Sequence, residues 1–138
     1  MSNKPKWIWY DAIVRRIHCC GCGKEVDARL TDGVEIYPHR PDLSNLPFWR
    51  CDTCGNFVGC HHNTKNRTKP LGCIPTAELR EERKKIHALI DPIWQSGKMS
   101  RRELYEAISR DVGWNYHTAE MRTMEEAKAV YRAASRYV

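Results

Sequence analysis

The sequence predicts an α+β protein in which a small β-hairpin module precedes a segment of three helices. Two observations support this prediction. All seven cysteines lie between Cys19 and Cys73, among short apolar runs that are separated by turn residues. Beyond Pro75 the apolar residues instead recur every three or four positions, which is the spacing of an amphipathic helix. We expect residues 1–75 to form the first module and residues 76–138 the helical subdomain, packed together as one unit.

The first module is predicted to consist of short strands. A strand over Asp11–His18 leads into the first pair of cysteines, because its apolar residues suit a half-buried strand. Two further segments, Glu25–Leu30 and Gly33–Tyr37, are expected to form a hairpin across the turn residues Thr31-Asp32-Gly33. The short apolar segment Phe48-Trp49 then leads into the second pair of cysteines.

Two segments of this module are predicted to be loops. Pro38–Leu43 contains two prolines, which remove backbone donors and break regular structure. Cys60–Pro70 is polar and basic and shows no apolar periodicity, so we expect a linker loop there. No internal repeat is visible apart from the two cysteine pairs themselves.

Three helices are expected after the linker. The first runs over about Ala77–Gln95 with Thr76 as its N-cap, and Pro92 is expected to bend it or end it early. The segments Ser100–Glu103 and Thr123–Glu126 each match the capping-box pattern, in which a hydroxyl and a glutamate three residues later satisfy the first backbone amides of a helix. A second and a third helix should therefore begin at these two segments.

The cysteine pairs have the spacing of a zinc site. Cys19-Cys20-Gly21-Cys22-Gly23 and Cys51-Asp52-Thr53-Cys54-Gly55 each place two thiols two residues apart, followed by a glycine that permits a tight turn. Two such turns give the tetrahedral donor set of one structural Zn²⁺ ion, which has no open position for catalysis. We expect the ligands to be Cys19, Cys22, Cys51 and Cys54. The alternatives are that Cys20 replaces Cys19, or that the cysteines are unligated or redox-active.

Other residues of the first half could have chemical roles. Cys60, His61, His62 and Cys73, with His39, are ligand types that zinc accepts, although their spacing is irregular. Alternatively, Cys60 packs as a small apolar residue and the histidines face solvent. A nucleophile pair of Cys60 and His61 is a further hypothesis, and it lacks an orienting third residue.

The loop that follows Tyr37 is a second candidate. Its prolines make it rigid, and His39, Arg40 and Asp42 would give it catalytic or recognition groups. Alternatively, Arg40 and Asp42 pair with each other or with the helical subdomain and have a structural role only. We retain the loop as a possible functional loop, together with Cys60 and His61.

The net charge of +6 and the pI near 9.0 favour an anionic partner, although such a charge also promotes solubility. Trp7, Trp9 and Tyr10 could stack on exposed bases. The alternative for the basic residues after position 76 is a solvated helix face, because Glu78 and its acidic neighbours alternate with them. We expect phosphate contacts from the residues of the basic loop and the first helix: Lys65, Arg67, Lys69, Arg80, Arg83 and Lys84.

The chain resembles a family of uncharacterised zinc-finger-containing proteins encoded by tailed phages and prophages. The resemblance covers about residues 19–130 and departs near the end, where Ala127 stands in place of a usual cysteine. It implies a four-cysteine zinc ribbon followed by helices, and it implies no activity. The segments that show it are Cys19–Gly23, Glu35–Leu43, Phe48–Cys51, Val58–His61, Pro70–Gly72, Glu78–Arg80, Arg83, His87, Asp91–Pro92 and Trp94.

Three functions are compatible with these observations. The first is a small phage or prophage accessory protein that is not an enzyme and binds DNA or RNA. The second is a protein-binding inhibitor or modulator of a host factor, such as a polymerase or a defence system. The third is a metal-dependent nuclease or hydrolase that uses His39, Asp42 and His61, which requires a second, open metal site. No stretch is apolar and long enough for a membrane span or a signal peptide, so we expect a protein of the host cytoplasm without a membrane partner.

Overall fold

The computed structural model describes residues 13–138 and confirms the α+β fold class. The chain divides into two compact units, with the boundary between Thr76 and Ala77. We call them the ribbon unit, which ends at Thr76, and the helical unit, residues 77–138. Trp7, Trp9 and Tyr10, which we proposed as stacking residues, and the first residues of the predicted strand 11–18 lie outside the described residues.

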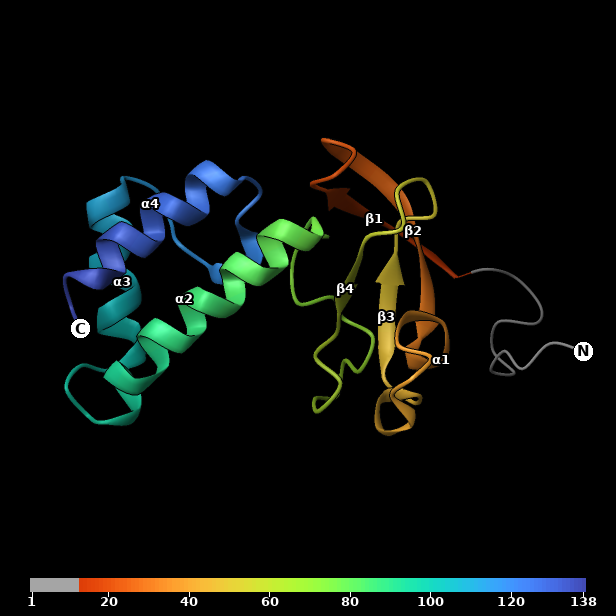
Figure 1. Cartoon of the computed structure of the whole chain (residues 1–138), viewed down its shortest axis with the longest axis horizontal. Helices are drawn as coiled ribbons and strands as arrows, with labels where there is room; N and C mark the ends of the chain where they lie inside the picture. The colour runs from red at the N-terminus through yellow and green to blue at the C-terminus, as the bar shows by residue number, and fades with distance from the viewer. Residues whose placement is uncertain (1–12) are drawn as a thin grey trace, which may run out of the picture. The chain divides into compact units, whose positions relative to one another are not determined.

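The described part of the ribbon unit is a four-stranded antiparallel sheet in the order β1-β2-β3-β4 (Figure 1). β1 (Val14–Cys19) pairs with β2 (Lys24–Asp32), with Ile17 opposite Val26. β3 (Pro47–Arg50) continues the sheet, and β4 (Phe57–Gly59) completes it. Each strand therefore pairs with the next one along the chain, and each cysteine pair lies in a turn between two paired strands.

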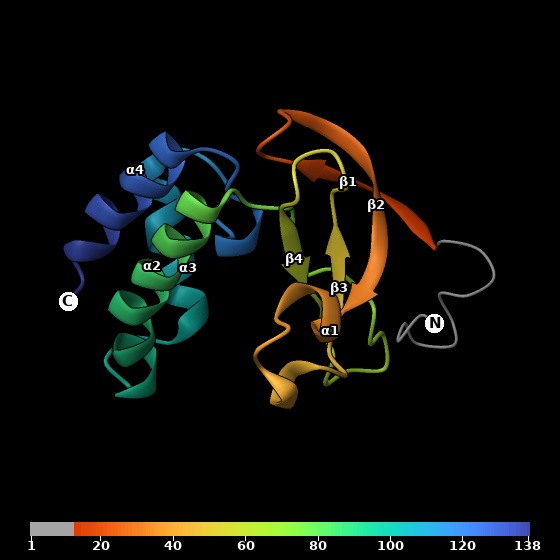
Figure 2. The same ribbon diagram turned by 45° about the vertical axis from the view of Figure 1, so that its right-hand side comes forward.

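The predicted hairpin between Glu25–Leu30 and Gly33–Tyr37 is wrong. The partners of β2 are β3 and β1, and Figure 2 shows the long paired strands β1 and β2; β2 runs on through Asp32. The carboxylate of Asp32 then accepts a hydrogen bond from the Val34 backbone amide and caps a single helical turn, α1 (Gly33–Ile36). A side chain at Gly33 would lie 1.8 Å from the Leu43 carbonyl oxygen, so this corner requires glycine. A 3₁₀ turn over Pro41–Leu43 lies in the loop that follows.

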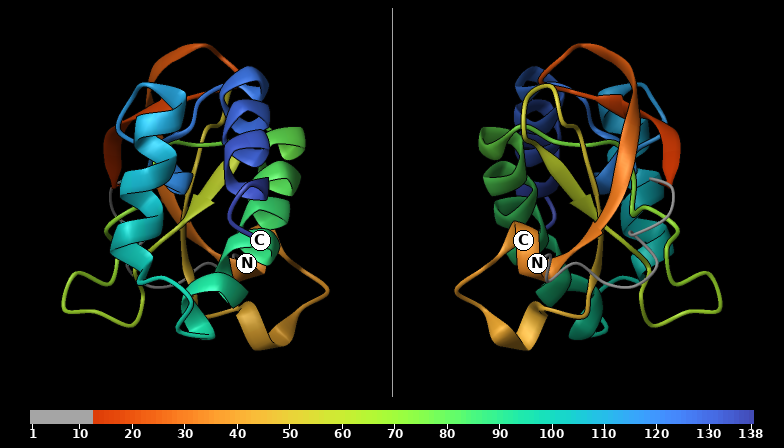
Figure 3. Two further views of the ribbon diagram at one scale, coloured as in Figure 1. Left: turned by 90° about the vertical axis from the view of Figure 1, so that its left-hand side faces the viewer. Right: turned by 90° about the vertical axis from the view of Figure 1, so that its right-hand side faces the viewer.

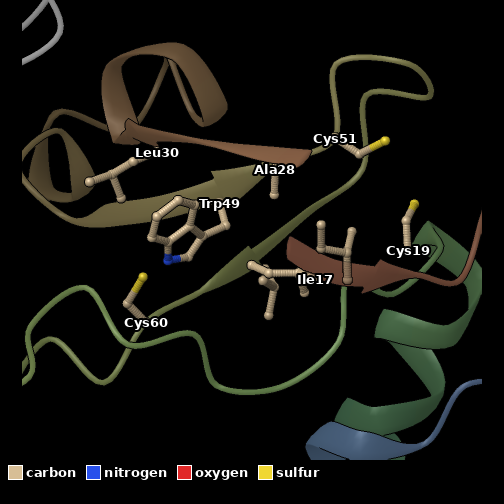
Figure 4. Packing of buried hydrophobic residues seen from close by; sticks show 9 residues of the cluster. Ile17, Cys19, Ala28, Leu30, Trp49, Cys51 and Cys60 are labelled. Carbon is tan, nitrogen blue, oxygen red and sulfur yellow. The ribbon is translucent and has the colours of Figure 1, made fainter. Parts of the chain in front are cut away.

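The core of the ribbon unit contains both aliphatic residues and cysteines. In Figure 4 the Trp49 indole lies between Leu30 and Cys60, and Cys19 and Cys51 lie at the other end of the cluster. The opposite face of the sheet carries a separate aromatic group, in which Tyr37, Phe48 and Phe57 meet edge to face at centroid distances of 5.5–5.8 Å. The cysteine turns are therefore continuous with the apolar core. The buried residues of the cluster are Ile17, Cys19, Ala28, Leu30, Trp49, Cys51, Val58, Cys60 and Ile74.

The helical unit contains the three predicted helices. They are α2 (Ala77–Gln95), α3 (Arg101–Val112) and α4 (Met124–Ser135), and α4 packs against both of the others (Figure 3). Both predicted capping boxes are present, at Ser100 with Glu103 and at Thr123 with Glu126.

The expectation that Pro92 ends α2 early is wrong, since the helix continues to Gln95. A short 3₁₀ turn over Thr118–Glu120 lies between α3 and α4. Leu79, Ile86 and Ile90 of α2 are almost completely buried, so the unit has an apolar core of its own. Within the described residues, no helix is both long and apolar enough to cross a membrane.

Candidate metal centre

The two cysteine turns have the same backbone geometry. In the first, the Gly23 amide donates a hydrogen bond of 2.8 Å to the Cys19 carbonyl, and Gly23 has a φ of 71°. In the second, the Gly55 amide donates a bond of 2.7 Å to the Cys51 carbonyl, and Gly55 has a φ of 81°. Both glycines adopt the left-handed conformation that other residues rarely adopt. Each C-x-x-C-G sequence therefore folds into a tight turn at the end of a strand.

The four cysteines of these turns lie close together. The Sγ atoms of Cys19, Cys22, Cys51 and Cys54 all lie within 4.8 Å of one another. The Sγ distance is 3.4 Å between Cys19 and Cys54 and 3.7 Å between Cys22 and Cys51. Four thiolates at about 2.3 Å from a tetrahedral Zn²⁺ ion would lie about 3.8 Å apart, so the observed cluster has nearly the dimensions of a zinc site. These four residues, which we call the four-cysteine cluster, could hold a metal ion.

The environment of the cluster favours thiolate at one position and thiol at another. Burial raises the pKa of the Cys19 thiol to about 12. The pKa of Cys51 is lowered to about 7, because the backbone amides of Cys54 and Thr53 donate to its sulfur and outweigh the opposing effect of burial. A metal ion is needed to hold all four sulfurs as thiolates at neutral pH, since their negative charges would otherwise repel one another.

Charged residues attach the second cysteine turn to the sheet. The guanidinium of Arg29 in β2 donates to both carboxylate oxygens of Asp52, at 2.8 and 2.9 Å, and Arg50 in β3 also pairs with Asp52. Arg29 further donates to Glu35 of α1 at 2.9 and 3.0 Å. Hydrogen bonding from Arg29 holds the pKa of Asp52 below its usual value. Asp52, between the two cysteines of its turn, therefore fixes the position of that turn on β2 and β3.

The remaining cysteines lie elsewhere. The sulfur of Cys20 lies 3.7 Å from that of Cys73, outside the four-cysteine cluster. Cys60 is buried, and its sulfur lies 3.6 Å from the Thr68 carbonyl, which also accepts the Trp49 indole N–H at 2.6 Å. Burial raises the pKa of Cys60 to about 11, so its thiol stays protonated at neutral pH. Cys60 thus packs as a small apolar residue in the described core.

The possible functional loop has internal partners. Arg40 and Asp42 form a two-bond ion pair, with N–O distances of 2.9 and 2.7 Å. His39 and His61 are exposed. Among residues 13–138, three or more metal-binding side chains lie close together only in the four-cysteine cluster. His39, Asp42 and His61 do not form a second cluster of this kind. Arg40 and Asp42 therefore pair with each other, as in the alternative that gave this loop a structural role only.

The basic loop forms part of a hollow of about 590 Å³ in the ribbon unit. We call this feature the basic hollow. The loop supplies Lys65, Arg67 and Lys69, and β1 supplies Arg15, which we did not single out from the sequence. The alternation of side chains along a strand could have indicated Arg15, because it lies on the same strand face as Ile17 and Cys19. The lining residues are Arg15, Lys65, Asn66, Arg67, Thr68 and Lys69, with no acidic residue among them.

The basic residues of α2 do not line the basic hollow. Arg83 is 9% exposed, and its guanidinium donates a 2.7 Å hydrogen bond to the Met121 carbonyl inside the helical unit. Lys84 is exposed and pairs with Glu81 at 3.2 Å. Arg80 is half-buried. The exposed pair of Lys84 and Glu81 fits the solvated helix face that we described as the alternative, whereas Arg83 is buried and has a structural role inside the unit.

Comparison with known proteins identifies the family. A family model described as a zinc-finger-containing domain, DUF3268, matches residues 15–136, which span both the four-cysteine cluster and the three helices. No curated protein matches the chain, and no solved structure matches it. The match covers most of the sequence, so the chain belongs to the DUF3268 family of zinc-finger-containing domains.

Proposed function

We propose that this protein is a zinc-binding accessory protein whose ribbon unit binds nucleic acid through the basic hollow. The observation that supports the proposal is the convergence of four cationic side chains on one concave surface without an acidic residue in the lining. Closely spaced Lys and Arg side chains bind phosphates of a nucleic-acid backbone by displacing condensed counterions. A nuclease would need an open metal site in addition, and the four-cysteine cluster has no free coordination position.

The loop of the basic hollow is held by hydrogen bonds. Its two ends are joined because the His61 amide donates to the Lys69 carbonyl at 2.9 Å. Arg67 donates to the carbonyls of Asn45 and His62 at 2.7 and 3.3 Å, so its guanidinium positions the loop as well as adding charge. Lys65 and Lys69 are exposed. A loop held in this way binds an anion with less loss of conformational entropy than a mobile tail.

The zinc ion would have a structural role in this function. Four cysteine ligands complete a tetrahedral coordination shell, and a bound ion joins the end of β1 to the turn after β3. Arg15 lies on β1, four residues before Cys19, so the metal would help to fix the strand that places Arg15 beside the loop. Loss of the metal should therefore weaken nucleic-acid binding indirectly.

The test is fluorescence anisotropy of labelled single- and double-stranded DNA and RNA with zinc-loaded protein over a range of salt concentrations. We expect binding whose affinity falls steeply with salt. The double substitution Lys65→Ala/Lys69→Ala should reduce the salt slope by about 2, since each phosphate contact contributes about 0.9. Arg67 is left in place because its removal would also disturb the loop.

The matched control is Lys84→Ala/Lys85→Ala on α2, which removes the same charge from exposed residues paired with Glu81 and Glu82. If the affinity falls equally in both double variants, only the net charge of the protein matters, and nucleic-acid binding by the basic hollow is contradicted. No binding at low salt would reject the proposal and favour the protein-binding alternative, with a host protein as partner. The resemblance to phage proteins implies that either activity takes place in the host cytoplasm.

A further inference from the structure

The helical unit contains a larger hollow that the proposed function does not use. It has a volume of about 780 Å³ and lies along α3 and the segment that follows it, and most of its surface is apolar. We call it the α3 groove. Small-molecule sites usually have volumes of roughly 300–1,000 Å³ and apolar walls with a few polar groups. The lining residues are Arg101, Arg102, Tyr105, Glu106, Ser109, Arg110, Asn115, Tyr116 and His117.

The α3 residues of the groove form two rows along the helix. One row has Arg101, Tyr105 and Ser109, and the other has Arg102, Glu106 and Arg110. Residues four apart lie above one another on a helix, so each row is continuous. The α3 residues that line the groove therefore include three arginines and one glutamate, a net charge of +2.

The half-exposed ring of Tyr105 lies beside these charges, and the buried ring of Tyr116 packs against it and supports it. The ring centroids of Tyr105 and Tyr116 lie 4.8 Å apart, and Trp114 meets Tyr116 edge to face at 6.4 Å. The guanidinium carbon of Arg101 lies 5.2 Å from the Tyr105 ring centroid and 5.8 Å from that of Trp94. A guanidinium held over rings in this way is preoriented and extends the planar surface, and nucleic-acid bases stack on both aromatic rings and arginine planes.

The other wall supplies hydrogen-bonding groups and charge. Asn115 and His117 are exposed, and the Asn115 side-chain amide lies 3.4 Å from the His117 ring nitrogen. Amide and imidazole groups can both donate to and accept from the edge of a base. Arg110 is exposed at the far end of its row, and Arg102 is partly neutralised by Glu106 at 3.0 Å. Because Arg101 is held over the rings of Tyr105 and Trp94, the phosphate would be bound mainly by Arg110.

We propose that the α3 groove binds a nucleotide, that is, one base with its phosphate. The base stacks beside Arg101 and Tyr105 with its edge toward Asn115 and His117, and Arg110 at the rim binds the phosphate. Both a free nucleotide and one unit of a single-stranded nucleic acid offer this chemistry. The site lies wholly within the helical unit and does not depend on the basic hollow.

The test is an NMR titration of the full-length, zinc-loaded, ¹⁵N-labelled protein with AMP, with adenosine and with inorganic phosphate. We expect AMP to shift the amide signals of residues 101–117. It should bind at least about tenfold more tightly than adenosine or phosphate, because only AMP engages both the rings and the arginines. AMP that shifts no signal in this segment at millimolar concentration would overturn the proposal. So would phosphate that binds as tightly as AMP.

Two double variants locate the site. Arg101→Gln/Arg110→Gln should weaken AMP binding about tenfold or more, since Arg101 stacks beside the base and Arg110 binds the phosphate. The matched control is Arg122→Gln/Arg132→Gln, which removes the same charge from exposed residues outside the groove and should leave AMP binding unchanged. Equal weakening of AMP binding in both variants would contradict a nucleotide site in the α3 groove.

The source of the nucleotide is decided by a second titration, with a short single-stranded oligo(dA) and an abasic oligonucleotide of the same length. The readout is the amide signals of residues 101–117, because both strands can also bind the basic hollow. Tighter binding of oligo(dA) than of AMP at these residues, lost in the abasic strand, identifies a single-stranded nucleic acid as the ligand, and binding of AMP alone there identifies a free nucleotide. Lys65→Ala/Lys69→Ala should not change AMP binding, and Arg101→Gln/Arg110→Gln should not change duplex binding, so failure of one proposal is distinguishable from failure of the other.

Discussion

The two units of this protein are stabilised in different ways. The helical unit has three helices, two of them with capping boxes, around an apolar core in which Ile86, Ile90 and Leu104 are fully buried. The ribbon unit has short strands, and four of the cysteines that close its sheet turns lie within 4.8 Å of one another. Small folds with limited apolar cores commonly need a metal or disulfides in addition. From this contrast we expect apolar packing to supply most of the folding free energy of the helical unit, and a metal ion bound by the four-cysteine cluster to supply much of that of the ribbon unit.

Removal of the metal should have the largest effect. We expect a strong chelator, or the substitution Cys51→Ser, to unfold the ribbon unit while the helices persist. Structural zinc contributes on the order of 10 kcal/mol to the folding of small zinc modules at neutral pH. NMR amide signals report the two units separately, and far-UV circular dichroism should retain its helical bands.

The control is Cys60→Ser, which changes a cysteine of the same unit outside the four-cysteine cluster. This variant should keep one bound zinc ion per chain, as measured by atomic emission. Cys51→Ser protein that is soluble, folded and fully loaded with zinc would contradict both the metal site and the contrast between the units.

The reciprocal change is Ile90→Ala in α2, which should destabilise the helical unit. Ile90 is fully buried, and truncation of such a side chain costs about 2–5 kcal/mol through lost burial and the cavity that remains. Denaturant unfolding followed by circular dichroism measures the loss. Zinc affinity, measured by competition with a chromophoric chelator, should stay unchanged, and a large decrease in affinity would show that the two units fold as one.

The features that were predictable from the sequence are local ones. The capping boxes at Ser100 and Thr123 depend on residues three positions apart, and the structure has both helices where these boxes placed them. The cysteine turns are equally local, because each C-x-x-C-G sequence encodes its own turn and its own glycine. The sequence also predicted the bounds of α2, and the helix contains Pro92 in its last turn, where a bend displaces only the few residues that follow.

The features that were missed depend on tertiary contacts. The segment that begins at Gly33 has the composition of a strand, yet it turns into α1 because Asp32 caps it and the Leu43 backbone packs against Gly33. The burial of Arg83 depends on the Met121 carbonyl, which is 38 residues away. Arg15 joins the basic loop only once the strands are paired. The Asp32 cap is a local contact, but the contacts of Gly33 with Leu43, of Arg83 with Met121 and of Arg15 with the basic loop have no short-range signature in the sequence.

A smaller prediction concerns the support of the metal centre. Asp52→Asn should reduce the free energy of unfolding of the ribbon unit by about 1–2 kcal/mol and zinc affinity by about tenfold, because Arg29 is only 17% exposed and loses a charged partner. The folded pKa of Asp52 lies below its unfolded value of about 3.9, so its contribution is complete at neutral pH and is lost only as the pH falls below about 4.

The control for Asp52 is Asp27→Asn, which breaks the exposed pair with Arg16 on the same sheet. Both side chains of that pair are more than 60% exposed, and such pairs usually contribute less than about 1 kcal/mol. Equal losses in the two variants would mean that Asp52 acts as an ordinary surface charge. Chelator competition at pH 7.5 and urea unfolding measure the two quantities.

The smallest expected effect is loss of a helix cap, and it tests whether the helical unit is as locally determined as its sequence indicates. Ser100→Ala removes the oxygen that accepts the Glu103 amide at 3.0 Å, and Thr123→Ala removes the equivalent bond to Glu126 at 3.1 Å. Each should cost about 1 kcal/mol. The two losses should add in the double variant, because the caps share no partner, and zinc affinity should not change. A loss well above the sum would mean that α3 and α4 depend on each other for their boundaries, and the helical unit would then be organised by long-range contacts, as the ribbon unit is.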